Sequence, residues 1–134
     1  MSTLVVDASV LLAALVDGGP DGEWATEQLA GGVLHAPHLL PVELSSVLRR
    51  AAASAGLSDA VAALAHADLS DLPVELYPFA PFADRVWELR STVTSYDAWY
   101  VSLAESLGCS LVTLDRRLAK APGVRCDVIT RRDR

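Results

Sequence analysis

Short apolar segments, too brief to be helices, alternate along this chain with longer segments of helical periodicity. The predicted strands are Leu4–Val6, Val33–His35, Val74–Tyr77, Leu111–Thr113 and Val128–Ile129. The predicted helices are Ser9–Val16, Asp21–Ala30, Leu40–Ala53, Ser58–Leu72, Pro81–Arg90, Tyr96–Leu107 and Arg116–Ala121. Strands that alternate with helices favour a parallel sheet covered by helices on both faces. The pattern therefore predicts an α/β fold, with Val74–Tyr77 as an edge strand because it carries Glu75 outward.

The length and composition are those of one folded domain. The chain has 134 residues, of which 51% are hydrophobic and 21% charged, and this composition excludes a disordered protein. A chain of this size buries roughly two-thirds of its unfolded surface, so its core does not depend on disulfides or metals. We therefore expect a single domain over residues 1–134.

From the sequence we expect neither a membrane span nor a secretory signal. Its longest apolar run, Val10–Val16, is much shorter than the about 20 residues that a spanning helix needs. The opening Met-Ser-Thr lacks a positively charged segment before the first apolar run. We therefore expect a cytoplasmic protein in which Cys109 and Cys126 are reduced thiols.

The charges are distributed unevenly along the chain. The net charge is −6, yet from Thr113 onward seven bases accompany three acids, whereas six acids and no Lys or Arg precede Arg49. An acidic body with a basic end fits a protein whose carboxylates hold a metal and whose arginines meet phosphate. A solvated acidic surface with a basic tail explains the same totals.

Four carboxylates fall where the predicted fold brings them to one edge of the sheet. Asp7 directly follows the first strand, and Asp115 follows the strand Leu111–Thr113 by one residue. Parallel sheets bind ligands at the carboxyl ends of their strands, so both side chains reach one site if these strands are neighbours. Glu43 and Asp97 lie in the first turns of helices that begin at the same edge, where the helix dipole favours a carboxylate. Helix capping and dipole compensation explain each acid singly, so the prediction depends on all four converging.

Clustered carboxylates raise one another's pKa and destabilise a fold unless a cation neutralises them. Mg²⁺ and Mn²⁺ prefer oxygen ligands, so the pattern predicts a site for one or two of these ions. Ser9 and Thr113 flank the acids and are candidates to orient a water or a ligand oxygen. A purely structural role as hydroxyl groups in turns explains both residues equally well.

Four segments together resemble a known family, the PIN-domain ribonucleases, and within it the VapC-type toxins. The segments are Leu4-Val5-Val6-Asp7-Ala8-Ser9, Ala36-Pro37-His38-Leu39-Leu40-Pro41-Val42-Glu43, Ser95-Tyr96-Asp97-Ala98-Trp99-Tyr100-Val101-Ser102-Leu103-Ala104 and Leu111-Val112-Thr113-Leu114-Asp115-Arg116-Arg117-Leu118. The third is similar to the family pattern Tyr-Asp-Ala-x-Tyr-x-x-Leu-Ala, and the fourth to Thr-x-Asp-x-x-Leu. The resemblance covers nearly the whole chain.

This resemblance implies a three-layer α/β/α sandwich with a five-stranded parallel sheet. It also implies endonucleolytic cleavage of RNA that depends on Mg²⁺ or Mn²⁺, and the role of toxin in a type II toxin–antitoxin pair. We expect Asp7 and Asp97 to be the principal metal ligands and Glu43 and Asp115 to complete the site. The implied partners are a second copy of the chain and a small antitoxin that fills the acidic pocket, often with an arginine.

The basic residues that follow Asp115 are candidates to hold the RNA backbone, namely Arg116, Arg117 and Lys120. The apolar face of residues 56–72, together with Leu11, Leu12 and Trp24, is a candidate groove for a partner helix. The alternatives are a non-catalytic binding module of the same fold and a nuclease that cuts DNA. A phosphoryl-transfer enzyme with Asp7 as acceptor is disfavoured, because Ser9 stands where such a site wants a second aspartate.

Overall fold

The computed structural model describes residues 2–54 and 56–132, and within them five strands form one sheet whose neighbours are all parallel. The strands are β1 (Thr3–Val6), β2 (Val33–Pro37), β3 (Val74–Tyr77), β4 (Ser110–Val112) and β5 (Val128–Ile129). Their spatial order is β3-β2-β1-β4-β5, so β3 is an edge strand as predicted. Each predicted strand is present: β3 and β5 have the predicted ends, and the ends of the other three shift by at most two residues.

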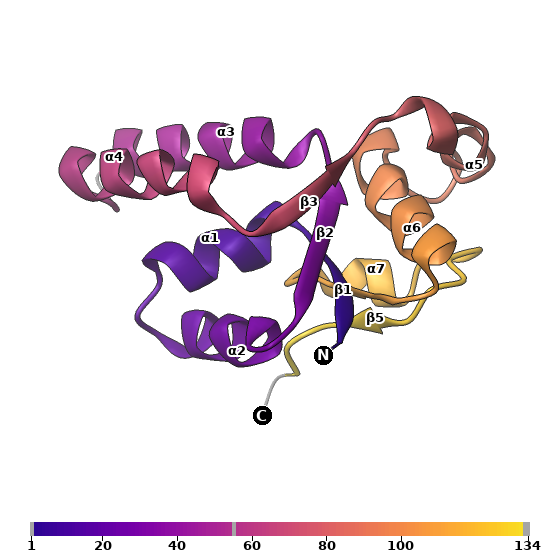
Figure 1. The fold of residues 1–134 in the computed structure, drawn as a ribbon, viewed down its shortest axis with the longest axis horizontal. Coiled ribbons are helices and arrows are strands. Elements are labelled where there is room, and N and C mark those ends of the chain that lie inside the picture. The colour runs from indigo at the N-terminus through magenta and orange to yellow at the C-terminus, as the bar shows by residue number, and fades with distance from the viewer. Residues whose placement is uncertain (1, 55, 133–134) are drawn as a thin grey trace.

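Helices cover both faces of this sheet (Figure 1). The α-helices are α1 (Ala8–Val16), α2 (Pro20–Leu29), α3 (Leu40–Ala53), α4 (Asp59–Ala67), α5 (Ala83–Glu88), α6 (Ser95–Leu107) and α7 (Arg116–Ala119). Two 3₁₀ turns, η1 (Asp68–Asp71) and η2 (Ala80–Phe82), flank β3. Helices α1 to α4 lie on one side of the sheet, and α5 and α6 lie on the other. The predicted three-layer α/β/α architecture is confirmed.

The order of the strands reverses at β1. Two connections carry the chain outward from β1 to β2 and then to β3, after which α5 and α6 bring it back to β4 on the other side of β1. Val5 is therefore paired with His35 on one side and with Leu111 on the other. In open parallel sheets the ligand crevice lies at such a reversal, outside the carboxyl ends of the strands. Asp7 follows one of these ends and Asp115 lies just beyond its neighbour.

Side-chain caps start several of the helices. The carboxylates of Asp7 and Asp115 accept hydrogen bonds from the N–H groups of Val10 and Arg117, and Ser58 starts α4 in the same way, as predicted. Gly108 ends α6 with φ at +66°, a left-handed conformation that favours glycine. Asp7 and Asp115 therefore do cap helices, and these hydrogen bonds also fix the positions of their carboxylates.

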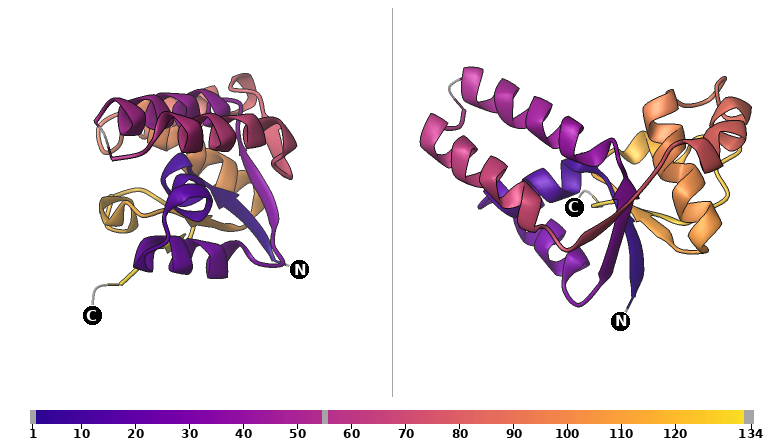
Figure 2. Two further views of the ribbon diagram at one scale, coloured as in Figure 1. Left: turned by 90° about the vertical axis from the view of Figure 1, so that its left-hand side faces the viewer. Right: turned by 45° about the horizontal axis from the view of Figure 1, so that its top comes forward.

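The structure corrects the predicted helix Ser58–Leu72. That segment divides into α4 and η1, and the expected inward face is only partly buried, because the exposed fractions of Val61 and Leu64 are 43% and 69%. Leu11 is buried in the core, so it cannot contribute to a partner groove. Figure 2 shows the pair α3–α4 and the pair α1–α2 extending on the same side of the molecule. Exposed apolar side chains on α4 therefore remain as the accessible part of the predicted partner face.

Two smaller expectations concern the membrane and the cysteines. Within residues 2–54 and 56–132, none of the helices has both the length and the apolar character needed to cross a bilayer. Cys109 and Cys126 are free thiols, as predicted.

Candidate active site

The carboxyl edge of the sheet borders a cavity of about 550 Å³ that is lined by acids. Asp7, Glu43, Asp97 and Asp115 all line it. They come from the end of β1, the first turn of α3, the first turn of α6 and the start of α7. The structure therefore brings the four acids predicted from the sequence into one cavity, although they are spread over most of the chain.

Asp7 is held by two hydroxyl groups. Ser9 Oγ donates to Asp7 Oδ1 over 2.6 Å, and Thr113 Oγ1 donates to Oδ2. Each hydroxyl also accepts a backbone N–H, that of Leu114 at Ser9 (3.1 Å) and that of Asp115 at Thr113 (3.0 Å). These contacts fix the Asp7 carboxylate and join the loops that follow β1 and β4. The predicted supporting positions of Ser9 and Thr113 thus have direct contacts to Asp7.

Burial raises the pKa of Asp7, and the negative charge of Asp97 raises it further, although hydrogen bonds from Ser9 and Thr113 act in the opposite direction. Burial also raises the pKa of Asp97, and the neighbouring charge of Asp115 adds to the effect. Ionisation of these carboxylates is therefore unfavourable in the folded chain, as expected for buried acids whose charges repel one another.

Glu43 is paired with a buried tyrosine, Tyr100, that was not among the site residues predicted from the sequence. Tyr100 Oη donates to Glu43 Oε1 over 2.7 Å, and Tyr100 lines the same cavity. Burial raises the pKa of Glu43, as do the charges of Asp7 and Asp97, while the bond from Tyr100 lowers it. Tyr100 lies three residues after Asp97 on α6, and this helical spacing was the available signal that both face the cavity.

Asp115 differs from the other three acids because an arginine neutralises it. Arg117 Nε and Nη2 lie 3.1 Å from Asp115 Oδ1 and Oδ2, a bidentate pair. Hydrogen bonding from Arg117 lowers the pKa of Asp115. The Arg117 side chain is otherwise exposed at the cavity rim, and Arg116 and Lys120 are exposed on the same short segment. The structure thus pairs one of the three candidate RNA contacts, Arg117, with the fourth acid.

Two further acids, Asp17 and Asp21, line the cavity and were not predicted from the sequence. They lie between α1 and α2 and at the first turn of α2, far from any strand end. Only the return of α2 beside α1 brings them to the cavity, and no local pattern reports that packing.

The chemistry of the cavity fits a hard divalent cation. Its lining side chains offer only oxygen donors, from carboxylates and hydroxyls. Among the residues that the structure describes, no three His, Cys, Asp or Glu side chains form a group able to hold an ion. Mg²⁺ is commonly bound through one or two carboxylates and keeps several of its waters. The arrangement therefore fits an ion with a partial protein ligand set, in a cavity with room for its waters.

Comparison with known proteins identifies the family. The PIN domain profile matches residues 4–124. Ribonuclease VapC9 of Mycobacterium tuberculosis is 41% identical over 125 residues, which cover 93% of this chain and 95% of that protein. Ribonuclease VapC1 of the same organism is 40% identical over 129 residues, 96% of this chain and 97% of that protein. The fold is shared with VapBC-5 of M. tuberculosis, a member of the VapBC family of toxin–antitoxin systems (TM-score 0.61, 20% identity, 97% and 99% of the two chains covered). The chain therefore belongs to the PIN-domain family and, within it, to the VapC ribonucleases.

Proposed function

We propose that this chain is the endoribonuclease toxin of a type II toxin–antitoxin pair, and that its acidic cavity cleaves RNA phosphodiesters with the help of Mg²⁺ or Mn²⁺. The observation that carries the proposal is the convergence of Asp7, Glu43, Asp97 and Asp115 on one cavity at the strand-order reversal. Burial and mutual repulsion raise the pKa of three of these acids, which favours binding of a divalent cation.

Asp7 and Asp97 are the residues that would hold the ion, with Glu43 and Asp115 completing the site directly or through water. When bound, such an ion lowers the pKa of a water molecule and polarises a phosphoryl oxygen. Ser9 and Thr113 orient the Asp7 carboxylate, and Tyr100 orients that of Glu43. Arg117 is placed to exchange its contact with Asp115 for an RNA phosphate at the cavity rim. Because RNA binding of this kind is electrostatic, we expect it to weaken with salt.

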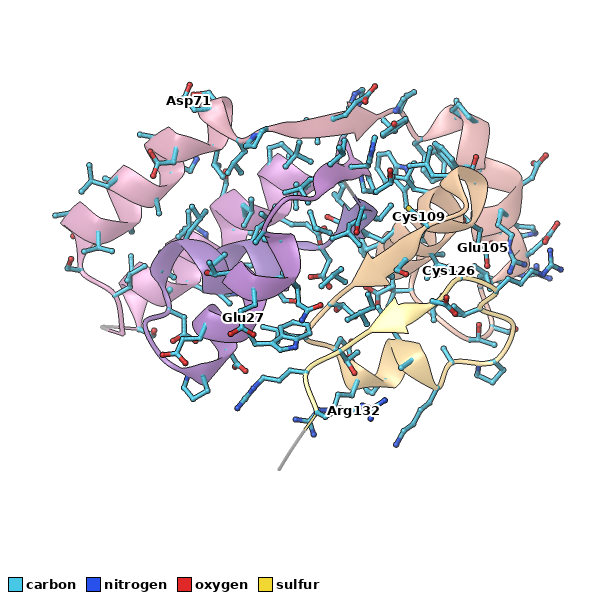
Figure 3. All side chains as sticks on the ribbon, turned by 60° about the horizontal axis from the view of Figure 1, so that its bottom comes forward. Glu27, Asp71, Glu105, Cys109, Cys126 and Arg132 are labelled. Atoms are coloured by element: carbon cyan, nitrogen blue, oxygen red, sulfur yellow. The ribbon has the colours of Figure 1, made fainter. Side chains whose placement is uncertain are left out.

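The test is cleavage of purified RNA by the wild-type chain and by Asp97→Asn, with Mg²⁺, with Mn²⁺ and with EDTA. We expect the substitution to slow cleavage by at least about 100-fold, since even indirect contacts to a metal ligand are worth about 10- to 100-fold. Asp71→Asn is the matched control, because it makes the same chemical change at an exposed carboxylate of η1 outside the cavity (Figure 3). Cleavage by folded Asp97→Asn at the wild-type rate would refute the assigned role.

A parallel digestion of single-stranded DNA separates the ribonuclease from a DNA-directed nuclease. The reading as a non-catalytic binding module predicts no cleavage of either nucleic acid under any metal condition. RNA cleavage that requires the metal excludes it.

The proposed protein partners are an antitoxin and a second copy of this chain. The negative cavity suits an arginine of an antitoxin, and the exposed Val61 and Leu64 on α4 suit the apolar face of a partner helix. Co-expression with the neighbouring open reading frame tests the first partner, and recovery of no complex contradicts it. Light scattering tests the second, since a homodimer has twice the chain mass of 14.2 kDa.

A further inference from the structure

A second cavity, of about 690 Å³, lies between α2 and the segment that follows β5. Its lining includes Glu23, Trp24 and Glu27 from α2 and Arg131 and Arg132 from the C-terminal segment. Figure 3 shows Glu27 on α2 and Arg132 on the C-terminal segment along the same side of the molecule. We call this space the Trp24 cavity.

A salt bridge joins the Trp24 cavity to the acidic cavity. Arg131 Nη1 donates to Asp21 Oδ1 over 2.9 Å. Asp21 lines the acidic cavity and Arg131 lines the Trp24 cavity, so this ion pair stands at the boundary between them. Because β5 is parallel to β4, Arg131 emerges at the same edge of the sheet as Asp115. The basic C-terminal segment is therefore beside the proposed cleavage site, and Arg131 and Arg117 are each paired with an acid of that cavity.

The side chains of the Trp24 cavity match what single-stranded nucleic acid needs. Proteins that bind such strands combine cations that follow the phosphates with aromatic rings on which the bases stack. Here Arg131 and Arg132 supply the cations, and the half-buried Trp24 supplies the ring. The exposed carboxylates of Glu23 and Glu27 repel phosphate, which orients the RNA backbone toward the arginines and the base toward α2.

We propose that the Trp24 cavity is a subsite for a nucleotide of single-stranded RNA next to the cleavage position. Arg131 and Arg132 position its phosphate, and Trp24 stacks against its base. The inference rests on the proposed function for its substrate class, since the acidic cavity defines where the strand is cut. It assigns residues outside the four acids and outside the segment 116–120 to substrate binding.

The test measures affinity for a short fluorescein-labelled single-stranded RNA by anisotropy over a range of KCl concentrations. The background is Asp97→Asn, so that the RNA stays intact. We expect Arg131→Gln to raise Kd by about 3- to 10-fold at low salt and to reduce the slope of log Kd against log salt by about 0.7, the loss of one phosphate contact. Arg131→Lys keeps the charge and should restore the slope. Trp24→Leu should raise Kd by about 5-fold or more with little change of slope, because stacking is not ionic.

The matched control is Arg125→Gln, which removes one exposed arginine just before β5, at the opposite end of that strand. We expect it to change neither Kd nor the slope. Equal effects of Arg125→Gln and Arg131→Gln would overturn the subsite, since they would reflect overall charge. If Trp24→Leu does not fold, Trp24→Phe serves instead: RNA should quench the tryptophan fluorescence of the parent, and quench it by a clearly smaller fraction in Trp24→Phe, because the stacked indole is then absent. Equal fractional quenching in the two proteins would contradict the stacking.

Cleavage by the chain without the Asp97 substitution is measured in parallel. RNA cleavage by this chain together with unchanged binding by Arg131→Gln overturns the subsite and leaves the proposed function intact. Binding that depends on Arg131, in a chain that cleaves no RNA, contradicts the proposed function and supports the subsite.

Discussion

Thr113 donates a hydrogen bond from its hydroxyl to Oδ2 of Asp7, joining two side chains that are 106 positions apart in the chain. The same hydroxyl accepts the N–H of Asp115, the residue that caps the start of α7. Because β1 and β4 are neighbours in the sheet, this one group links two of the four acids of the cavity. The position of Asp7 therefore depends on a residue that need not touch a substrate.

Thr113→Val tests this dependence, since valine has nearly the same shape and lacks the hydroxyl. Thr113 is fully buried, so the substitution leaves the Asp115 N–H without its partner and Asp7 with one donor fewer. We expect the free energy of unfolding to fall by about 1–3 kcal/mol and RNA cleavage to fall at a temperature where the variant is folded. Thr113→Ser keeps the hydroxyl and should retain most of the cleavage. Urea unfolding and an RNA cleavage assay measure both effects, and a valine variant as active as the wild type would contradict the role.

The raised pKa values of Asp7, Glu43 and Asp97 predict how the metal-free protein responds to pH. Carboxyls titrate near pH 4 in the unfolded chain and at higher pH in the fold, so between these values the folded state binds more protons. Stability contributed by these groups is therefore lost as pH rises through the raised pKa values. We expect the melting temperature in EDTA to increase as pH is lowered from 7 toward 5. A melting temperature that falls as the pH is lowered from 7 toward 5 would contradict the raised pKa values of these acids.

Asp97→Asn and added metal test the same repulsion at constant pH. In EDTA at pH 7 we expect the variant to melt about 2–5 °C above the wild type, since about 1 kcal/mol shifts a domain of this size by a few degrees. Mg²⁺ or Mn²⁺ should stabilise the wild type by about 2.7 kcal/mol at 100 times its Kd, through binding to the folded state alone. The variant should respond less. Thermal shifts with and without metal measure this, and an equal metal response in both proteins would remove Asp97 from the ligand set.

The sequence was informative about the fold wherever the signal was local. The helix over residues 40–53 was predicted with the ends that it has, because Pro41 fits its first turn and Gly56 follows its end. Gly108 marked the end of α6, because glycine readily adopts the left-handed conformation that ends a helix. The division of residues 58–72 was missed, because its apolar residues have helical spacing whether or not a neighbour covers them. The exposure of Leu64 is a property of the tertiary arrangement alone.

The candidate site was predictable to the extent that strand ends define it. Asp7 and Asp115 follow strands, and parallel strands end at one edge, so their convergence followed from the topology. Tyr100, Asp21 and Arg131 reach this region through the packing of α6, the return of α2 and the exit of β5. For Tyr100 the spacing from Asp97 on α6 was a local signal, but no short pattern reports the positions of Asp21 and Arg131, so these two emerged only with the structure.

A second ion pair lies near the C-terminal end of α6, the end opposite to Asp97. It contributes to the stability of the fold and lies outside the acidic cavity. Arg85 Nε lies 2.7 Å from Glu105 Oε1 and Nη2 lies 3.0 Å from Oε2, while Nη2 also donates to the carbonyl of Gly123 over 2.6 Å. The exposed fractions of the Arg85 and Glu105 side chains are only 20% and 13%. Burial alone would raise the pKa of Glu105, yet hydrogen bonds from Arg85 and the Arg125 N–H lower it. The pair therefore stabilises the fold at neutral pH, and this contribution is lost as pH falls through the lowered pKa.

Glu105→Gln should reduce the free energy of unfolding by about 2–3 kcal/mol at pH 7, because it removes the less exposed of the two carboxylates that neutralise a largely buried guanidinium. Glu88→Gln is the control, since Glu88 also binds Arg85, at 3.1 Å, but is 60% exposed, and its loss should cost less than about 0.5 kcal/mol. Urea unfolding of both variants measures the difference, which should narrow as pH is lowered. RNA cleavage at a temperature where both are folded should equal that of the wild type, because Glu105 is absent from the acidic cavity. Equal losses of stability in the two variants would mean that burial adds nothing to the Arg85–Glu105 pair.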